Sequence, residues 1–324
     1  MSSKSEILKV LEAQKGKSVS GEELATHVGV SRTAIWKAIN SLKADGYDIK
    51  AVTNKGYMLE DLNDILSVEG ILPFVEDAKF IEKLQIFDVL ESTNITAKKL
   101  GIDGAPSGTI IIANEQTSGR GRMGRKFYSP PNTGLYMSCM LRPSVSADDC
   151  VLITTATSVA VCRAIEGLTK RKPKIKWVND IFLDGKKVCG ILTEAVTDFE
   201  SGSIECVVVG IGINVDTVDF PTEIQNIAGG IYAERTGKIS RNQLAARVIC
   251  ELSNIENMIK SHDYIEEYKK RSMVLGKEVR IISGKEEIVD VVDIDQNGGL
   301  VIKHKDGEVT VLRTGEVSVR LTNT

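Results

Sequence analysis

The spacing of apolar residues over positions 1–60 predicts short helices at the start of the chain. Apolar side chains recur at helical spacing from Ile7 to Leu11. Ser20 and Glu23 form the S-x-x-E pattern of a capping box, which predicts a second helix that ends near Gly29. This region therefore begins with two helices in quick succession.

A third helix is predicted to begin after Ser31. Its apolar residues fall on one face, before Gly46 stops the helix: Ile35, Ala38, Ile39 and Leu42. The segments 47–52 and 56–60 then flank the turn Thr53-Asn54-Lys55, which predicts a β-hairpin. Two short helices joined by a glycine-containing turn and followed by a hairpin indicate a winged helix-turn-helix.

The polar face of this third helix has the chemistry of a DNA-binding surface. Residues 31–57 carry five cations (Arg32, Lys37, Lys43, Lys50, Lys55) against two anions (Asp45, Asp48), as phosphate contacts require. Trp36 borders the apolar face, so we expect it to pack rather than to touch bases. The predicted DNA-binding residues are Ser31, Arg32, Thr33, Lys37, Asn40 and, on the hairpin, Lys55. The alternative is a winged helix that docks another protein.

The end of the chain has a different pattern, with short β-rich runs separated by Gly, Asn or Asp turns. These runs predict a small five-stranded barrel, and they lie at 277–282, 286–294, 298–304, 308–313 and 316–321. A region of mixed α and β character lies between the two ends. We therefore expect domains at 1–64, 65–272 and 273–324, in an α+β fold with the chemistry in the middle.

Composition excludes several classes of protein. The 324 residues have a formal net charge of only -3, so any basic binding surface must be local. The start of the chain lacks the apolar core of a signal peptide and no long apolar run follows, so we expect a cytoplasmic protein with no membrane contact. The six cysteines form no C-x-x-C pair and the three histidines lie far apart, so we expect reduced packing cysteines, no zinc site and no histidine-based triad.

The segment GRGRMGRK, residues 119–126, satisfies the G-x-G-x-x-G pattern of dinucleotide-binding folds. That fingerprint must follow a strand directly and open a helix. Here four residues separate the apolar strand 108–114 from Gly119, and Pro130 and Pro131 forbid a helix afterwards. We therefore interpret the match as a coincidence.

The cations between these glycines are the stronger signal. Arg120, Arg122, Arg125 and Lys126 crowd one segment, which is favourable only if an anion neutralises them. Arginine suits a phosphate, because one guanidinium donates two parallel hydrogen bonds. We expect this segment to be mobile when empty and to close over an anion. The alternative, an RNA-binding RGG-like tract, would be repetitive and disordered.

A second segment, 175–192, points to the same charge. Asp184-Gly185 is a strong two-residue turn signal between apolar runs. A hairpin closed there would set Asp180 opposite Cys189 and diagonally beside Lys187, so that the carboxylate could orient the ammonium group. Lys176 and Asn179 add donors nearby. The alternative is an ordinary solvated ion pair.

The apolar strand 204–215 contains a third candidate feature. Gly210 and Gly212 are two residues apart and therefore lie on the same face of the strand. We expect the missing side chains to open a slot for a flat or chain-like ligand, although close helix packing is an alternative.

Four motifs in order resemble the biotin protein ligases: ESTN (91–94), EQTSGRGRMGR (115–125), KWVNDI with K-x-x-GIL (176–192) and GIGINV (210–215). With the helix-turn-helix, the chain resembles the bifunctional members that also repress the biotin operon. The resemblance implies a central class II synthetase-like domain and a C-terminal SH3-like barrel. It also implies that biotin, ATP and Mg²⁺ give biotinyl-5′-AMP, from which biotin passes to a lysine of the biotin carboxyl carrier protein of acetyl-CoA carboxylase.

The same resemblance implies roles for individual residues. Ser92, Thr93, Asn94 and Gln116 would bind the ureido head of biotin, and Gly210 and Gly212 would receive its tail. Arg122 and Lys187 would act at the carboxylate and the α-phosphate, with Asp180 supporting the lysine or the metal. The remaining biotin- or adenylate-binding residues are Gly119, Arg120, Gly121, Lys176, Asn179 and Gly190. Val178, Cys189 and Met123 depart from residues common in the family, but none removes a group that the reaction needs.

Partners and competing functions follow from the same resemblance. Family members bind operator DNA through the front domain and form homodimers when the adenylate is bound. One alternative is a biotin-responsive DNA-binding regulator without ligase activity. Another is an enzyme similar to lipoate or octanoate ligases, against which the helix-turn-helix and the arginine-glycine segment argue.

Overall fold

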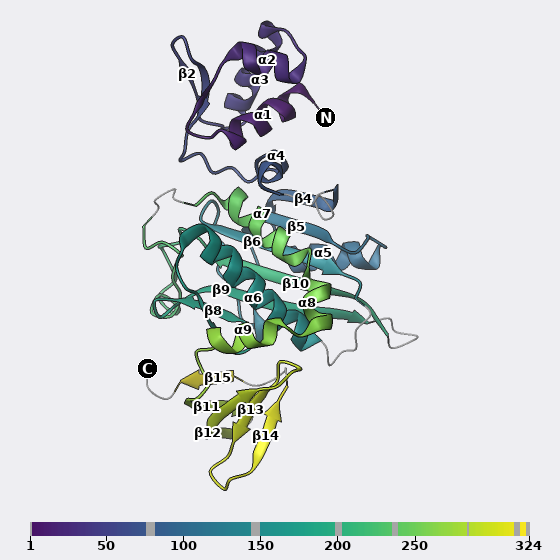
Figure 1. Ribbon diagram of the computed structural model, residues 1–324, viewed down its shortest axis with the longest axis vertical. Helices are drawn as coiled ribbons and strands as arrows, with labels where there is room; N and C mark the ends of the chain where they lie inside the picture. The colour runs from purple at the N-terminus through teal and green to yellow at the C-terminus, as the bar shows by residue number, and fades with distance from the viewer. Residues whose placement is uncertain are drawn as a thin grey trace.

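The computed structural model describes residues 2–75, 82–143, 150–197, 203–234, 239–283, 285–313 and 318–321. Three parts follow one another along the long axis of the molecule (Figure 1): a small helical part, a central layered part, and a C-terminal sheet. The fold is thus a helix-turn-helix domain, a central α/β domain and a small β-sheet domain.

The N-terminal helices are α1 (Ser3–Ala13), α2 (Gly21–Val28) and α3 (Arg32–Ala44). The predicted caps are present, because Ser20 accepts a hydrogen bond from the Glu23 amide and Ser31 accepts one from the Ala34 amide. Gly29 ends α2 in the left-handed conformation, at φ 71°. The three predicted helices are therefore confirmed.

The predicted hairpin forms the wing of this domain. Strands β2 (Ile49–Val52) and β3 (Gly56–Leu59) pair antiparallel, and a short strand that the sequence did not signal, β1 (Ser18–Val19), adds to β3. The helices and the wing enclose a hydrophobic core of their own, which includes Ile35, Ile39 and Leu42 of α3. This part thus has the topology of a winged helix-turn-helix.

The central part is built on a seven-stranded sheet in the order β4-β5-β6-β10-β9-β8-β7. Only β4 and β5 pair parallel, and the other neighbours are antiparallel. The strands, in that order, are β4 (Leu84–Leu90), β5 (Thr109–Gln116), β6 (Gly134–Leu141), β10 (Ile204–Asn214), β9 (Lys186–Thr197), β8 (Asp180–Leu183) and β7 (Lys174–Lys176).

Helices cover the two faces of this sheet unequally. The large core lies under α6 (Cys150–Thr169), α7 (Arg241–Leu252), α8 (Ile255–Ser261) and α9 (Tyr264–Arg271), which lie in front of the sheet in Figure 1. The opposite face carries α5 (Thr93–Ile102), which buries a small cluster that includes Ile111, Met140 and Val208. One helix cannot cover seven strands, so part of that face is left for a cavity.

Among the described residues, α6 is the one helix that is long and apolar enough to cross a membrane. However, 78% of its apolar window is buried inside the protein, as is typical of a core helix.

The five C-terminal strands are confirmed, but the predicted closure into a barrel is not. They are β11 (Glu278–Ser283), β12 (Lys285–Ile294), β13 (Leu300–Lys303), β14 (Val309–Leu312) and β15 (Ser318–Leu321). Their order is β14-β13-β12-β11-β15, so β14 and β15 are edges that do not pair within the described residues. The indole N–H of Trp177 donates to the carbonyl of Gly298 at 3.0 Å and ties this sheet to the central part.

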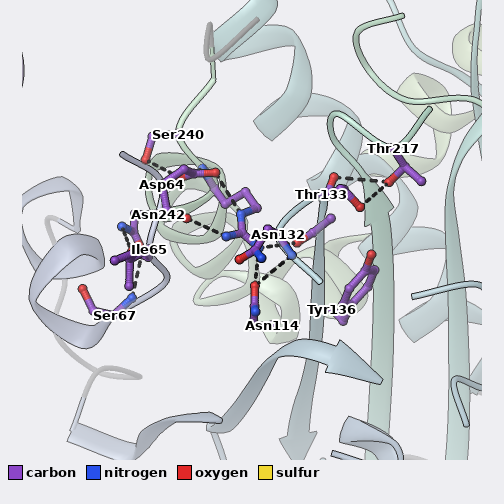
Figure 2. Close-up of polar contacts among 12 residues, drawn as sticks. Asp64, Ile65, Ser67, Asn114, Asn132, Thr133, Tyr136, Thr217, Ser240 and Asn242 are labelled. Atoms are coloured by element: carbon purple, nitrogen blue, oxygen red, sulfur yellow. Dashed lines mark hydrogen bonds and ion pairs between the residues drawn. The ribbon is translucent and has the colours of Figure 1, made fainter. Parts of the chain in front are cut away.

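A buried arginine joins the wing domain to the central sheet. Arg241, at the start of α7, is only 1% exposed and donates to the carboxylate of Asp64 from Nε (2.8 Å) and from its amide (2.9 Å). It also donates from Nη1 to the side chain of Asn114 at the end of β5, at 2.8 Å. Figure 2 shows Asp64, Asn114, Ser240 and Asn242 gathered around this point. We call Asp64, Asn114 and Arg241 the Arg241 cluster.

The segment that leaves the wing is held along its length by the same helix start. The amide group of Asn242 donates to the carbonyl of Ile65 (2.8 Å) and accepts from the amide of Ser67 (3.2 Å). After this segment come α4 (Val68–Ile71) and the short 3-10 helix η1 (Leu72–Phe74). Since the Asn242 side chain is fully buried and these bonds are partly so, they fix the path of the connection instead of leaving it a free tether.

Arg241→Ala is expected to lower the free energy of unfolding of the central part by about 3 kcal/mol, because it leaves the Asp64 carboxylate partly buried without its partner. Urea denaturation followed by Trp177 fluorescence, in a Trp36→Phe background, measures this. Arg247→Ala is the matched control, since Arg247 is exposed on the same helix. Equal losses from the two variants would show that the Arg241 cluster adds nothing to stability.

Candidate functional site

A cavity of about 750 Å³ lies on the same face of the central sheet as α5, over the part of that face that α5 does not cover. Every residue predicted for the biotin or adenylate site except Gly119 lines it: Ser92, Thr93, Asn94, Gln116, Arg120, Gly121, Arg122, Lys176, Asn179, Asp180, Lys187, Gly190, Gly210 and Gly212. Gly119 lies behind the wall, where a β-carbon would approach the carbonyl oxygen of Phe127 to 2.4 Å. Four separate sequence motifs thus meet in one hollow.

Hydroxyl and amide groups form one end of the cavity. Ser92 and Thr93 lie where β4 ends and α5 begins, and both are buried. The amide and hydroxyl of Thr93 both lie within hydrogen-bond distance of Gln116 Oε1, at 2.8 and 3.1 Å. Gln116 Nε2 in turn donates to Ser129 Oγ at 2.9 Å, so the orientation of its side chain is fixed. This end suits a compact polar group that both donates and accepts hydrogen bonds.

Residues 119–126, which we call the arginine loop, fold as a tight hairpin over the cavity. The amide of Gly121 donates to the carbonyl of Arg125 at 2.7 Å, and the amide of Phe127 donates to that of Gly119 at 2.9 Å. The loop contains one turn of 3-10 helix (Arg122–Gly124) and then runs extended, so it opens no α-helix. The loop thus lacks the helix that a dinucleotide fingerprint opens, as Pro130 and Pro131 predicted.

Arg122 points inward from this loop. Its Nη1 donates to Asn179 Oδ1 at 3.3 Å. Burial lowers the pKa of the Arg122 guanidinium, and the nearby Arg125 lowers it further, while Asp180 partly offsets both effects. An arginine remains protonated even so. A positive charge is therefore held in a partly desolvated place, where an incoming anion would be bound more strongly than in water.

The predicted hairpin at 175–192 is present, with one correction to its register. Asp184 and Gly185 both have positive φ, at 47° and 79°, as the two-residue turn requires. Leu183 pairs with Lys186 as expected, but Asp180 lies opposite Gly190 and not opposite Cys189. The reason is a β-bulge between the pairs of Ile181 and Phe182, which inserts one residue in β9.

The predicted ion pair survives this shift. Lys187 Nζ lies 2.5 Å from Asp180 Oδ1, and both side chains are about one quarter exposed, at 28% and 25%. The backbone of Lys187 also exchanges hydrogen bonds with Ile227 and Gly229, which lie in the segment that follows β10. Lys187 is thus held from two sides with its ammonium group at the cavity.

The two glycines of β10 do not open the slot that the sequence predicted. A β-carbon at Gly210 would come within 2.1 Å of Asn94 Oδ1, and one at Gly212 within 2.5 Å of the Phe127 ring. The space beside each glycine is therefore filled by a side chain of the protein. Both glycines still line the cavity, and their role is to let Asn94 and Phe127 lie flat against the sheet.

The charges around the cavity are strongly unbalanced. Among the described lining residues there are six cations and one carboxylate, that of Asp180; the cations are Arg120, Arg122, Arg125, Lys126, Lys176 and Lys187. Cations this close to one another repel, and the repulsion is relieved when anions bind between them. The site is therefore suited to a ligand that carries phosphate or carboxylate groups.

Three residues that sequence reasoning did not name individually also line the cavity. Tyr128 and Phe220 line it with ring centroids 6.2 Å apart, and Asn214 contributes a buried Oδ1 that lacks a hydrogen-bond partner. An unpaired buried acceptor is costly unless a ligand donates to it. Asn214 stands inside the motif GIGINV, but nothing in the pattern showed that it faces the cavity.

Neither the cysteines nor a cluster of metal-binding side chains adds a second site among the described residues. All six cysteines are free, and burial raises the pKa of Cys139 and of Cys162 to about 12, so these thiols stay protonated. Within the described part of the chain, no group of three or more His, Cys, Asp or Glu side chains is arranged to hold a metal.

The predicted DNA-binding residues of α3 and the wing, Ser31, Arg32, Thr33, Lys37, Asn40 and Lys55, are all exposed. Arg32 forms an ion pair with Glu22 at 2.6 Å, so it would have to exchange that partner for a phosphate. The expectation that Trp36 packs was wrong: it is 57% exposed, beside Lys37 on this face.

Three family models match the chain in order. Residues 4–58 match an HTH domain, residues 86–214 match the biotin/lipoate A/B protein ligase family, and residues 274–320 match the biotin protein ligase C terminal domain. The three matches fall on the winged helix, the cavity-bearing sheet and the C-terminal sheet.

Named relatives and solved structures agree with these matches. The bifunctional ligase/repressor BirA of Escherichia coli is 30% identical over 311 residues, which is 94% of each chain. That of Bacillus subtilis is 39% identical over 225 residues, or 69% of each chain. The biotin protein ligase of Aquifex aeolicus, solved in complex with biotin and ATP, superposes with a TM-score of 0.65 at 29% identity and covers 74% of this chain and 100% of its own.

The order of the domains, the motifs around the cavity and the likeness over nearly the whole length lead to one assignment. This chain belongs to the bifunctional ligase/repressor family of biotin protein ligases.

Proposed function

We propose that this chain activates biotin with ATP to biotinyl-5′-AMP and passes biotin to a lysine of the biotin carboxyl carrier protein of acetyl-CoA carboxylase. The observation that carries the proposal is the cavity itself, in which six cations and one carboxylate lie beyond a hydroxyl- and amide-lined end. One end suits the ureido group, and the cationic part suits a carboxylate beside a phosphate.

The chemistry needs no nucleophile from the protein. In the first step the carboxylate of biotin attacks the α-phosphorus of ATP, and pyrophosphate leaves. In the second the neutral amine of the carrier lysine attacks the acyl carbon, AMP leaves, and the amine gives up a proton. The protein must bring anions together and stabilise charge on the phosphoryl oxygens, which is positioning and electrostatics. Arg122 and Lys187 are the groups that we place at the carboxylate and the α-phosphate.

The supporting residues follow from their positions. Asp180 holds the ammonium of Lys187, and Asn179 accepts from Arg122, so both fix the direction of a cation. Arg120, Gly121 and Lys176 line the same part of the cavity, where we place the phosphate. We place the adenine beside the rings of Tyr128 and Phe220, with Asn214 Oδ1 accepting from its amino group.

We further propose that Mg²⁺ enters with ATP. Mg²⁺ is commonly held by one or two carboxylates together with substrate phosphates and water. Asp180 is the carboxylate among the described lining residues, and Asn179 adds an amide oxygen beside it, so these residues fit such an ion. When bound, the ion would neutralise charge on the phosphates.

Because the chain belongs to this family, its N-terminal winged helix-turn-helix represses biotin genes by binding operator DNA. We propose that the adenylate-bound chain forms a homodimer, since a two-fold pair of winged helices would bind two half-sites. We also propose a cytoplasmic location, a class II synthetase-like central domain, and an SH3-like barrel formed by the five C-terminal strands.

Lys187→Ala is expected to reduce the rate of adenylate formation at least about 10²-fold, because it removes a preorganised charge at the reacting phosphate. An ATP–pyrophosphate exchange assay with biotin measures this. Lys174→Ala is the matched control, because Lys174 is exposed on β7, two strands away from Lys187 in the same sheet. Full exchange activity in the Lys187 variant would remove Lys187 from the reaction.

Transfer to the apo carrier separates a ligase from a regulator that only senses biotin. Purified protein, biotin, ATP and the carrier domain should give biotinylated carrier, detected by mass. Lipoate added in excess should not slow this transfer, since a dithiolane ring cannot use the hydroxyl- and amide-lined end. Lipoylation of a carrier in place of biotinylation would favour the lipoate-ligase alternative.

Lys37→Ala is expected to weaken operator binding and to reduce the slope of log K against log salt concentration by about one unit, the contribution of one phosphate contact. Titrations of operator DNA at several salt concentrations, with biotinyl-5′-AMP present, measure this. Lys260→Ala, which removes an exposed helical lysine of the central part, serves as control. If Lys37→Ala left the slope of log K against log salt concentration as unchanged as Lys260→Ala does, this face of α3 would not bind DNA.

A further inference from the structure

A buried polar relay runs behind the hydroxyl-lined end of the cavity, and no step of the proposed reaction uses all of it. Ser138 of β6 is fully buried and lies opposite Gly210 in the sheet. Its Oγ is 2.7 Å from Thr93 Oγ1 and 2.6 Å from Asn94 Oδ1. Asn94 Nδ2 then donates to Glu194 Oε2 at 2.7 Å. The relay therefore runs from the cavity wall to a carboxylate on β9.

The Glu194 carboxylate sets the orientation of the Asn94 amide. A carboxylate only accepts hydrogen bonds, and so does the carbonyl of Leu192, to which Asn94 Nδ2 also donates at 3.3 Å. Both amide hydrogens of Asn94 are therefore used inside the protein, and its Oδ1 must face Ser138. Lys98 donates to the other oxygen of Glu194, so this carboxylate is itself held in place.

The orientation of Asn94 decides which hydrogen bonds the wall can offer. Thr93 and Ser138 have one hydroxyl hydrogen each, while Asn94 Oδ1, Gln116 Oε1 and the two hydroxyl oxygens are acceptors within their reach. Both hydrogens are thus taken inside the protein, and Thr93 offers lone pairs to the cavity. With the Asn94 amide reversed, its NH₂ would donate to Ser138, and the Ser138 hydroxyl hydrogen would turn to Thr93 Oγ1, where it would occupy a lone pair that Thr93 otherwise offers to the cavity.

We propose that Glu194 is a positioning residue for biotin recognition, which acts through Asn94 and Ser138 to make Thr93 a hydrogen-bond acceptor. The inference rests on the proposed function, because the ureido group of biotin supplies the N–H that such an acceptor requires. It also changes the role of Asn94 from the one expected from the sequence. Asn94 orients the wall, and its two amide hydrogens are not available to the ligand.

Glu194→Gln tests this inference. Gln can donate to Asn94 Oδ1 and so permits the reversed amide, in which Ser138 donates to Thr93 and weakens Thr93 as an acceptor for the ureido N–H. Biotin affinity should fall about tenfold, as expected for about one lost hydrogen bond, while ATP affinity stays unchanged. Desthiobiotin, which keeps the ureido group, should lose affinity by the same factor. Calorimetric titrations of each ligand measure this, and Glu194→Asp should restore part of the loss by keeping the charge.

Two further variants separate orientation of the amide from general effects on folding. Glu205→Gln removes the carboxylate of another partly exposed ion pair, with Arg142, on the neighbouring strand β10, and should leave biotin affinity unchanged. Lys98→Met keeps the carboxylate of Glu194, so it should cost much less affinity than Glu194→Gln. A loss from Lys98→Met as large as that from Glu194→Gln would show that the ion pair matters and not the direction of the relay.

The outcomes distinguish this inference from the proposed function. Wild-type biotin affinity in Glu194→Gln, or equal losses for biotin and ATP, would overturn the inference and leave the proposed ligase intact. Absence of biotin binding by the unmodified chain would overturn the proposed function itself.

Discussion

Repulsion among cations that share one cavity is the constraint on which the rest of this structure depends. Six positive side chains line the cavity, with Asp180 as the single carboxylate among the described residues there. In a partly desolvated site such repulsion is stronger than in water, and it is relieved only by anions. A carboxylate and a triphosphate are anions that repel each other in solution. The same field that makes the empty site unfavourable therefore brings the two reactants together.

The sheet supplies the rigid frame for this field. Lys187 and Asp180 belong to one hairpin, Arg122 belongs to the loop between β5 and β6, and the hydroxyl-lined end begins at α5. Each group comes from a different strand connection, but all of them are fixed to the same seven strands. Positioning of this kind depends on packing far from the reacting atoms.

The Arg241 cluster shows how the DNA-binding part is fixed to the same frame. Asp64, which follows the wing, is bound by Arg241, and Arg241 also binds Asn114 at the end of β5 (Figure 2). Asn114 accepts in addition from the amide of Asn132, beside Thr133, whose carbonyl accepts from the amides that begin the segment after β10. The connection to the wing and one border of the cavity are thus parts of one hydrogen-bonded assembly.

Local signals predicted local structure well, and non-local contacts limited the rest. The serine caps and the Asp184-Gly185 turn act within a few residues, so the helices and the hairpin were predictable. The β-bulge that sets Asp180 opposite Gly190 was not, because the pairing of β8 with β9 alone does not require it. The filling of the glycine slots by Asn94 and Phe127 depends on segments far away in the chain, as does the place of Asn214 in the cavity. Whether the C-terminal sheet closes into a barrel likewise depends on contact between its edge strands β14 and β15, which are not paired among the described residues.

Hydrogen exchange of the arginine loop tests the central claim most directly. Amide exchange in residues 119–126 should be fast in the protein alone, and it should slow when biotin and ATP together form the adenylate between the cations. Biotin with a non-hydrolysable ATP analogue provides the control for binding without the reaction. Equal exchange in the empty and the adenylate-loaded protein would contradict the account, because the loop would then not respond to the anion that it is arranged to bind.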